Sequence, residues 1–479
     1  MRRLTVLLIF LSQFIFHQVV SQDSTLFYSA DVQAAISSNT VPFWMRSNQY
    51  GAVPDHGSFM LARAGLYHVY NKNNPRILQW SGGMEVIANA GKTSSAFFSD
   101  LYIAGKAGPL ELVIGQRKEY TGLIDTLLSS GSVALSQNFR PIPKVQLSTP
   151  NFTNIIPGSD FIAFKFSYSD GLFGPAKVQY GRVQEVPKTY FHQKSLYLRL
   201  GGAANKLKLF AGFNHQAMWG GETKIWAGGL KTLEAYKYVI FGKPWFNSRV
   251  GNHFGTVDLA AEWKGKSWCI FAYRQNIYED GSLAELSNIK DGLNGLRFKR
   301  INQENSATLF TVNTVLIEYL YTKSQGGAIF DYDAGIFGND NYFNHYVYQQ
   351  GWSYKGRSIG TPLIGPKVLN RTDLPSLGTA YANNNRLSAI HLGMQASWME
   401  MMFTVKGTFS NNFGTYSVPF SPAVKQASLY IRAEKPISFR IKSLLTLSLA
   451  TDFGKLYPNS AAIMIGWKKT GYLNSFHIR

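Results

Sequence analysis

Residues 195–200 read Ser-Leu-Tyr-Leu-Arg-Leu, and this short stretch shows the pattern that decides the fold. Successive side chains of a β-strand point to opposite faces of the sheet, so apolar residues at every second position predict a strand with one apolar face. We expect Leu196, Leu198 and Leu200 to lie on that face. The opposite face carries the residues between them: Ser195, Tyr197 and Arg199.

The same alternation recurs along the chain, with mostly polar residues at the intervening positions. Its apolar positions are Ile162, Phe164, Phe166 and Tyr168; Leu207, Leu209 and Ala211; Ile437, Phe439 and Ile441; and Leu445, Leu447 and Leu449. A soluble β-sandwich or propeller would turn these apolar faces inward. An outer-membrane barrel would turn them toward lipid and line its interior with the polar faces.

Composition and residue placement favour the barrel. Only 16% of the 479 residues are charged, below the roughly 25% typical of soluble proteins. Aromatic residues cluster near the ends of the alternating segments, where the interfacial girdles of a barrel lie. They are Tyr168, Trp263, Trp268, Tyr273, Tyr319, Tyr321, Trp398 and Phe403. We therefore predict an all-β protein, an antiparallel transmembrane barrel of the outer membrane. At about 25 residues for each strand and its connection, it would have about 18 strands.

The N-terminus predicts a signal peptide over residues 1–21, followed by a single barrel domain over residues 22–479. Two arginines precede an apolar stretch at residues 4–16, and Val-Val-Ser at residues 19–21 offers a cleavage site. About 13 apolar residues are too few to span a bilayer as an anchor. Since the chain has one cysteine, Cys269, export fits a bacterial envelope better than a disulfide-rich secreted protein.

Short and long connections are expected to alternate, as in barrels with short periplasmic turns and long extracellular loops. Gly, Asn and Pro residues predict tight turns at residues 71–75, 105–109 and 201–205. Long loops are expected at residues 125–143, 280–305, 331–371 and 410–424.

The sequence lacks the familiar motifs of catalysis, so we predict no enzymatic activity, no cofactor and no metal. There is no G-x-S-x-G elbow, no H-E-x-x-H helix and no P-loop. A catalytic triad is a spatial arrangement, which leaves an outer-membrane lipid hydrolase open as a minor alternative. The formal net charge of +20 indicates an anionic partner. Export and the lack of a known binding module argue against nucleic acid.

Two polar segments are candidates for the barrel interior. Residues 123–143 combine hydroxyls, amides and two prolines; they predict either a plug that folds into the barrel or a surface loop. The plug candidates are Asp125, Ser129, Ser132, Asn138 and Arg140. Residues 213–222 follow a predicted strand and end in a glycine pair and a glutamate, with either a structural or a lumen-lining role. The candidates there are Asn214, His215, Gln216, Trp219 and Glu222.

Several separated motifs occur in a fixed order along the chain. They are Val-Pro-Phe-Trp-Met-Arg-Ser-Asn-Gln-Tyr-Gly at 41–51, Leu-Ser-Ser-Gly-Ser at 128–132 leading to Asn-Phe-Arg-Pro-Ile-Pro at 138–143, His-Gln-Lys-Ser-Leu-Tyr-Leu-Arg at 192–199, the stretch 213–222 with Trp-Gly-Gly-Glu, Gly-Asn-Asp-Asn-Tyr at 338–342, Gly-Arg-Ser-Ile-Gly-Thr-Pro at 356–362 and Asp-Phe-Gly-Lys-Leu-Tyr at 452–457. In these motifs the chain resembles the capsule-assembly outer-membrane proteins called Wzi.

The resemblance implies an 18-stranded outer-membrane barrel that helps attach or organise capsular polysaccharide at the cell surface. Members of this family are regarded as lectin-like, and their pattern supplies no catalytic residues. The chain departs from many outer-membrane barrels at its end, Phe-His-Ile-Arg at residues 476–479, where an aromatic residue is usual. The helical elements that some members carry on the periplasmic side are not evident in the sequence.

The segment 331–357 suggests the same function on independent grounds. Aromatic rings can stack on the C–H faces of sugars, amides bind hydroxyls, and cations pair with uronate or phosphate groups. The predicted polysaccharide-binding residues are Tyr342, Tyr346, Tyr348, Trp352, Tyr354, Lys355 and Arg357. An interfacial aromatic girdle followed by a loop is the alternative.

The first functional hypothesis is therefore a lectin-like barrel that binds capsular or other anionic surface polysaccharide and contacts outer-membrane lipid. The second is a diffusion channel whose basic lumen selects anionic solutes. Planar-bilayer conductance separates the two, because a plugged barrel should pass little steady current.

Overall fold

The computed structural model describes residues 25–71, 76–246, 248–279, 282–301, 310–331, 333–438 and 443–473. The predicted signal peptide, most of the predicted turn at 71–75 and the alternating positions 439 and 441 lie outside these residues.

The described residues form a closed antiparallel barrel of 18 strands. Segments β6 and β7 both pair with β8 and together fill one position, and β23 pairs with β1 to close the barrel. The strands are β1 (Leu26–Ser37), β2 (Phe59–His68), β3 (Leu78–Gly91), β4 (Ser95–Ala107), β5 (Leu110–Gln116), β6 (Lys144–Ser148) with β7 (Thr153–Asn154), β8 (Ile162–Lys177), β9 (Glu185–Leu200), β10 (Leu207–Trp219), β13 (Asn252–Lys264), β14 (Trp268–Tyr278), β15 (Gly292–Arg300), β16 (Thr311–Tyr321), β19 (Leu387–Trp398), β20 (Met401–Gly414), β21 (Pro419–Ser438), β22 (Ser443–Gly454) and β23 (Ser460–Leu473). Closure leaves no unpaired strand edge in lipid. The predicted fold class is confirmed.

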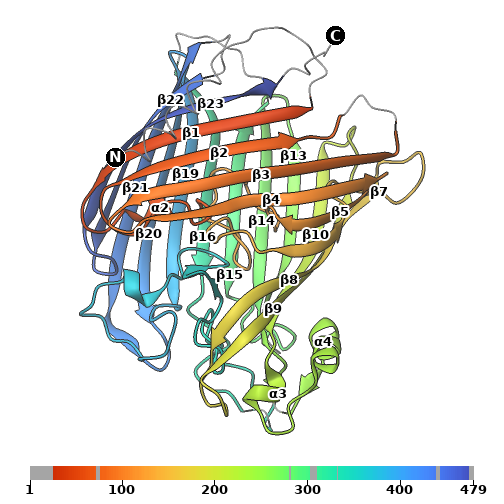
Figure 1. The fold of residues 1–479 in the computed structure, drawn as a ribbon, viewed down its shortest axis with the longest axis vertical. Helices are drawn as coiled ribbons and strands as arrows, with labels where there is room; N and C mark the ends of the chain where they lie inside the picture. Colours follow the sequence, from red (N-terminus) through yellow and green to blue (C-terminus); the bar gives the residue numbers. More distant parts are fainter. Residues whose placement is uncertain are drawn as a thin grey trace, which may run out of the picture.

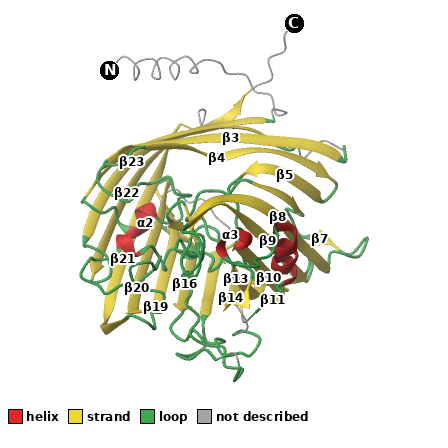
Figure 2. Cartoon of the chain, turned by 60° about the horizontal axis from the view of Figure 1, so that its bottom comes forward, coloured by secondary structure: helices red, strands yellow, loops and turns green. Residues whose placement is uncertain are grey.

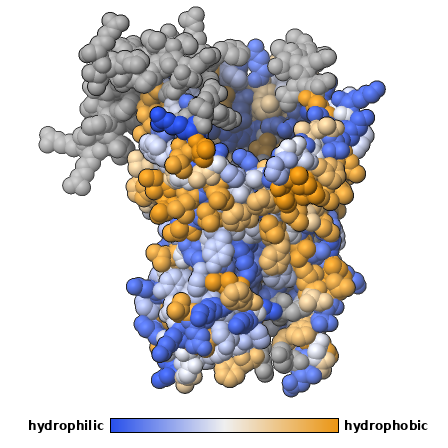
Figure 3. All heavy atoms as spheres, turned by 90° about the vertical axis from the view of Figure 1, so that its right-hand side faces the viewer, coloured by the Kyte–Doolittle hydropathy of each residue, from blue (hydrophilic) through white to orange (hydrophobic). Residues whose placement is uncertain are grey.

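The outer wall follows the predicted alternation. Leu196, Leu198 and Leu200 expose 46%, 42% and 43% of their surface, whereas Tyr197 exposes 5%. The leucines of β22 alternate in the same way with buried Thr446 and Ser448. Figure 3 shows the result as a band of apolar residues across the wall. No helix in the described ranges is long and apolar enough to cross a membrane.

The two ends of the barrel differ in their connections. At the terminal end, where Leu26 pairs with Leu473, the connections are short, such as residues 108–109 and 399–400. At the opposite loop end lie the long connections: residues 38–58, 117–143, 220–251 and 322–386. Figure 1 shows the helices α3 (Glu222–Ile225) and α4 (Thr232–Phe241) at the loop end, below the barrel.

Two predicted long loops are wrong because glycine and asparagine occur there inside strands. Residues 280–305 contain β15, in which a Cβ at Gly295 would lie 2.1 Å from the Tyr273 ring, so glycine makes room for that ring in the lumen. Residues 410–424 contain the end of β20 and the start of β21, joined by residues 415–418 alone. Buried Asn412 donates from Nδ2 to the Val424 carbonyl across this pair.

The largest apolar core lies inside the barrel and combines side chains of the connections with inward-facing side chains of the strands. Figure 2 shows loops and the short helix α2 (Phe43–Arg46) within the ring of strands. The connection 322–386 also holds the hairpin of β17 (Ser353–Tyr354) and β18 (Arg357–Ser358) and the 3-10 turn η2 (Lys367–Leu369). The largest side chains with under 2% exposure include Trp352, Tyr342, Phe43, Phe191, Phe254 and Phe343.

Candidate functional site

Residues 117–143 enter the lumen and bind inward-facing side chains of several strands, among them β13, β14, β15, β16 and β19. We call this segment the plug. Glu318 on β16 accepts hydrogen bonds from Ser129 Oγ at 2.6 Å and from the Ser130 backbone N–H at 2.7 Å. Gln275 on β14 accepts one from the Val133 backbone N–H at 3.0 Å. Because these partners come from the wall, the plug is fixed to the barrel and not only to itself.

Further contacts bind the plug to β13 and β19 and shape its own turn. Asp258 Oδ2 accepts a hydrogen bond from the Leu123 backbone N–H at 3.0 Å, and His391 Nε2 lies 2.8 Å from the Leu128 carbonyl. Asp125 Oδ1 accepts the backbone N–H groups of residues 127 and 128, at 2.9 and 2.6 Å. Its Oδ2 lies 3.4 Å from Arg297 Nη1. A carboxylate that caps a turn while pairing with the wall holds the plug in one position.

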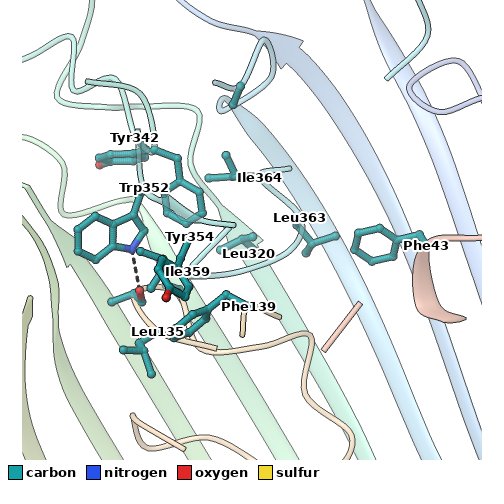
Figure 4. Close-up of a cluster of buried hydrophobic side chains, with 14 of the residues drawn as sticks. Phe43, Leu135, Phe139, Leu320, Tyr342, Trp352, Tyr354, Ile359, Leu363 and Ile364 are labelled. Atoms are coloured by element: carbon teal, nitrogen blue, oxygen red, sulfur yellow. Dashed lines mark hydrogen bonds between the residues drawn. The ribbon is translucent and has the colours of Figure 1, made fainter. Parts of the chain in front are cut away.

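The connection 322–386 packs on the plug from the loop end. Trp352 Nε1 donates to the Ala134 carbonyl at 2.8 Å, the contact drawn as a dashed line in Figure 4. Ser136 Oγ donates to the Gly360 carbonyl at 2.7 Å, and Asn138 Nδ2 donates to the Ser358 carbonyl at 3.3 Å. The Trp352 ring lies 5.6 Å from Phe254 on β13, measured between centroids. Plug, loop and wall therefore share one core.

This packing corrects most of the predicted polysaccharide-binding set. Tyr342 and Trp352 are fully buried, Tyr348 is 2% exposed and Tyr354 is 9% exposed, so their ring faces are not available to a sugar. The hydroxyls of Tyr342 and Tyr348 also have internal partners: Asp291 Oδ2 and the Gly220 carbonyl, each at 2.9 Å. The asparagines and glycines between these rings allow the tight turns that bury them, which is why the segment looked like an exposed loop.

The two predicted cations of this segment have different surroundings. Arg357 Nη2 lies 2.9 Å from Asp55 Oδ1 and donates to the Val53 carbonyl at 2.6 Å. Burial lowers the pKa of its guanidinium. Arg357 therefore joins connection 38–58 to connection 322–386, whereas Lys355 is exposed at the surface. Of the predicted aromatic residues, Tyr346 is 51% exposed.

The candidates on β10 and beyond do not converge on one site. Asn214 and Gln216 face the lumen and bind each other. His215 lies on the outer side, where its Nε2 is 2.8 Å from His253 Nδ1, and Trp219 packs in a separate outer cluster with Ala235 and Val239 of α4. Glu222 Oε1 accepts the Gly220 N–H at 2.8 Å, and burial raises the Glu222 pKa.

The remaining plug candidates have structural partners. Ser132 Oγ lies 3.3 Å from Gln275 Oε1. The guanidinium of Arg140 lies 3.6 Å from the centre of the Phe97 ring, and burial lowers its pKa. Among the described residues no group of His, Cys, Asp and Glu has the geometry to hold a metal ion.

A cavity of about 270 Å³ lies between the plug and the wall. Its lining includes three residues that sequence reasoning missed: Tyr120, Lys406 and Arg432. Lys406 and Arg432 are cations on the polar faces of strands, and Tyr120 precedes the predicted plug segment by three residues. These residue types can be read from the sequence, but only the fold brings together positions that lie so far apart along the chain.

Comparisons with known proteins support the fold. No family model matches the chain, and no curated protein does. The solved structure of Wzi, described as an outer-membrane protein involved in group 1 capsule assembly in Escherichia coli and a carbohydrate-binding β-barrel, is 13% identical with a TM-score of 0.59, covering 98% of this chain and 88% of that one. OccAB4 of Acinetobacter baumannii is 9% identical with a TM-score of 0.48, covering 94% and 99% of the two chains. OccK5 of Pseudomonas aeruginosa is 9% identical with a TM-score of 0.47 over the same shares. At this identity, the likeness to Wzi establishes the fold of an outer-membrane barrel.

Proposed function

We propose that this protein is a non-enzymatic barrel of the bacterial outer membrane that binds surface polysaccharide and helps attach it to the cell. The apolar band on the wall and the predicted export signal support the location. The observation that carries the proposal is the filled lumen. The plug and connections 38–58 and 322–386 occupy it as a packed core, with partners in the wall.

The filled lumen favours binding over diffusion because a general channel needs a continuous water-filled path. Here Trp352 of connection 322–386 donates a hydrogen bond to the plug, and Arg357 of the same connection contacts residues 53 and 55. Opening a path would break these buried contacts. The likeness to a carbohydrate-binding barrel adds support for the same role.

Because the predicted rings are buried, the proposed surface for polysaccharide consists of other residues at the loop end. Tyr180 is 78% exposed and Tyr346 is 51% exposed. They come close because the Gln179 backbone N–H donates to the Val347 carbonyl at 2.9 Å. We define the loop-end patch as Lys177, Tyr180, Arg182 and Tyr346, all of which are exposed. It offers rings for sugar faces and cations for acidic groups.

The test compares cells that have and lack the gene, together with the purified barrel. Deletion should release surface polysaccharide from the cell into the medium, and the intact gene should restore attachment. In planar bilayers the purified protein should pass little steady current. Normal attachment after deletion would contradict the function, and a large selective anion current would favour a channel. Lipid hydrolysis that is lost on replacing one serine would contradict the non-enzymatic role.

A further inference from the structure

The cavity beside the plug lies toward the terminal end of the barrel. Its wall is formed by Thr404 and Lys406 of β20 and by Tyr430, Arg432 and Glu434 of β21. Strand β20 begins at Met401 and β21 ends at Ser438, both at the terminal end, and these residues lie three to eight positions from those strand ends. Figure 3 looks over that rim into a hollow lined by hydrophilic residues.

The plug presents an apolar ledge to this cavity. Tyr120 is 53% exposed and Leu127 is 50% exposed, and both line the cavity. Large apolar side chains exposed on the wall face lipid, but these two lie in the lumen, where burial would be expected to remove them from water. A ring and an aliphatic side chain held open beside polar groups are typical of a site for an amphipathic ligand.

Polar groups surround the ledge. Gln49 Oε1 accepts a hydrogen bond from Arg63 Nη2 at 3.1 Å, which leaves its amide nitrogen for other contacts. Asn48 Oδ1 has no hydrogen-bond partner among the described residues. Gln137, which donates from Nε2 to the Thr126 carbonyl at 3.2 Å, also lines the cavity. Sugar hydroxyls both donate and accept, and amides match both roles.

Two cations face the ledge from the wall. No carboxylate of the described residues lies within 4 Å of Lys406 Nζ, which sits 5.1 Å from the centre of the Trp44 ring. Arg432 Nη2 pairs with Glu434 Oε1 at 2.7 Å, while its buried Nε has no hydrogen-bond partner in the described part of the chain. The two carboxylates of the lining, Asp125 and Glu434, pair with Arg297 and Arg432, so Lys406 is left to meet an anionic group opposite the ring.

We propose that this cavity is a second binding site, for an acidic saccharide that enters from the terminal end of the barrel. The proposal rests on the proposed polysaccharide function and adds an inner site to the loop-end patch. The Tyr120 ring stacks on a sugar face, the amides of residues 48, 49 and 137 bind hydroxyls, and Lys406 with Arg432 holds the carboxylate. The packed plug closes the loop side, so the barrel can hold a chain end reached from the periplasm.

The binding test uses the full-length barrel in detergent and titration calorimetry, with tetragalacturonate as probe and neutral maltotetraose as comparison. Tetragalacturonate should bind, and maltotetraose should bind more weakly. Tyr120→Ala and Lys406→Gln should each weaken binding about tenfold, while Tyr120→Phe, which keeps the ring, should bind almost as well as the original. Tyr319→Ala on the outer wall and Lys266→Gln in a terminal-end turn are matched controls and should leave binding unchanged.

The direction of entry is tested with a membrane-impermeant maleimide. In a Cys269→Ser background, Tyr120→Cys should react only after the outer membrane is permeabilised, whereas Lys237→Cys on α4 at the loop end should react on intact cells. Labelling of Tyr120→Cys on intact cells would overturn entry from the terminal end.

The outcomes separate the two proposals. If tetragalacturonate does not bind, or binds equally to the cavity variants and the original, the inner site is wrong, and polysaccharide attachment still stands on the gene-deletion result. If the cavity variants lose binding although deletion leaves attachment normal, the inner site stands and the attachment function is wrong.

Discussion

The outer wall of this barrel exposes large apolar side chains, whereas the core of its lumen buries them. On the wall, Leu198 exposes 42% of its surface, and in the lumen Trp352 exposes none. The wall meets hydrocarbon, so an exposed leucine loses nothing by facing outward. The lumen meets water, so its connections bury their rings as a soluble protein does. The same residue types therefore indicate opposite orientations, depending on which solvent the segment faces.

The strongest test of this comparison removes the central ring of the lumen core. Trp352→Ala should lower the free energy of unfolding by about 3–5 kcal/mol, because it leaves a cavity and removes the donor to the Ala134 carbonyl. Urea unfolding in detergent measures the loss. Tyr346→Ala, in the same connection but half exposed, is the matched control and should change stability by at most about 0.5 kcal/mol. Equal losses for the two variants would contradict the packed core.

The next test places a charge on each face of the wall. Leu198→Arg should destabilise the barrel by about 2–4 kcal/mol if Leu198 lies near the bilayer midplane. Met402→Arg places the same side chain on the lumen face at a partly exposed position, opposite Glu434 on β21, and should cost much less. Folding yield and urea unfolding in lipid vesicles give both values. A larger loss for Met402→Arg would mean that the two faces are assigned wrongly.

The outer wall could be predicted from sequence because its signal is local. Leu196 to Leu200 alternate within five residues, and a period of two has one structural meaning. The connections carry no such period. Composition alone gave the aromatic segment 331–357 as an exposed sugar surface, but the partner of Trp352 is Ala134, 218 positions away in sequence. Contacts of that range are set by the closed barrel, which decides which connections share the lumen.

The same limit explains the candidate site. Residues 123–143 were recognised as a polar segment with a choice between plug and surface loop, since hydroxyls and amides suit either place. Whether this segment is a plug or a surface loop depends on its contacts with Glu318 and Gln275. The alternation of their strands predicts that both side chains point inward, but it does not predict that they bind the plug. Tyr120 and Lys406 were missed for the same reason.

A pH change should loosen connection 322–386 through His345, which lies in that connection. Its Nδ1 accepts the backbone N–H groups of Val347 and Tyr348, each at 3.1 Å, so the ring must be neutral on that side. Burial lowers the pKa of His345 to about 3, whereas the unfolded chain takes up this proton near pH 6.5. The folded state therefore binds fewer protons between these values. The contribution of neutral His345 to the free energy of unfolding is fully present above pH 6.5. It decreases as the pH falls, and about 2 kcal/mol is lost at pH 5.

His345→Asn supplies the control for this pH effect, because an amide oxygen can accept the same N–H groups and does not titrate. Unfolding of both proteins is followed at pH 7.5 and pH 5. The original should lose about 2 kcal/mol more than the variant between these two values. Parallel losses would show that His345 is not held neutral in the folded protein.

The smallest effect on stability is expected at the loop-end patch, where exposure replaces burial. Lys177→Ala combined with Arg182→Ala should change the free energy of unfolding by at most about 0.5 kcal/mol, since both side chains are exposed. The pair should nevertheless reduce attachment of an acidic polysaccharide to cells. The reduction should be greatest at low salt, because attraction between exposed charges is screened within about 8 Å at physiological ionic strength. Lys266→Ala removes an exposed cation at the terminal end and should leave attachment unchanged. If it reduces attachment equally, the overall positive charge and not the patch attracts the polysaccharide; if the paired variant attaches normally at every salt concentration, the patch does not bind it.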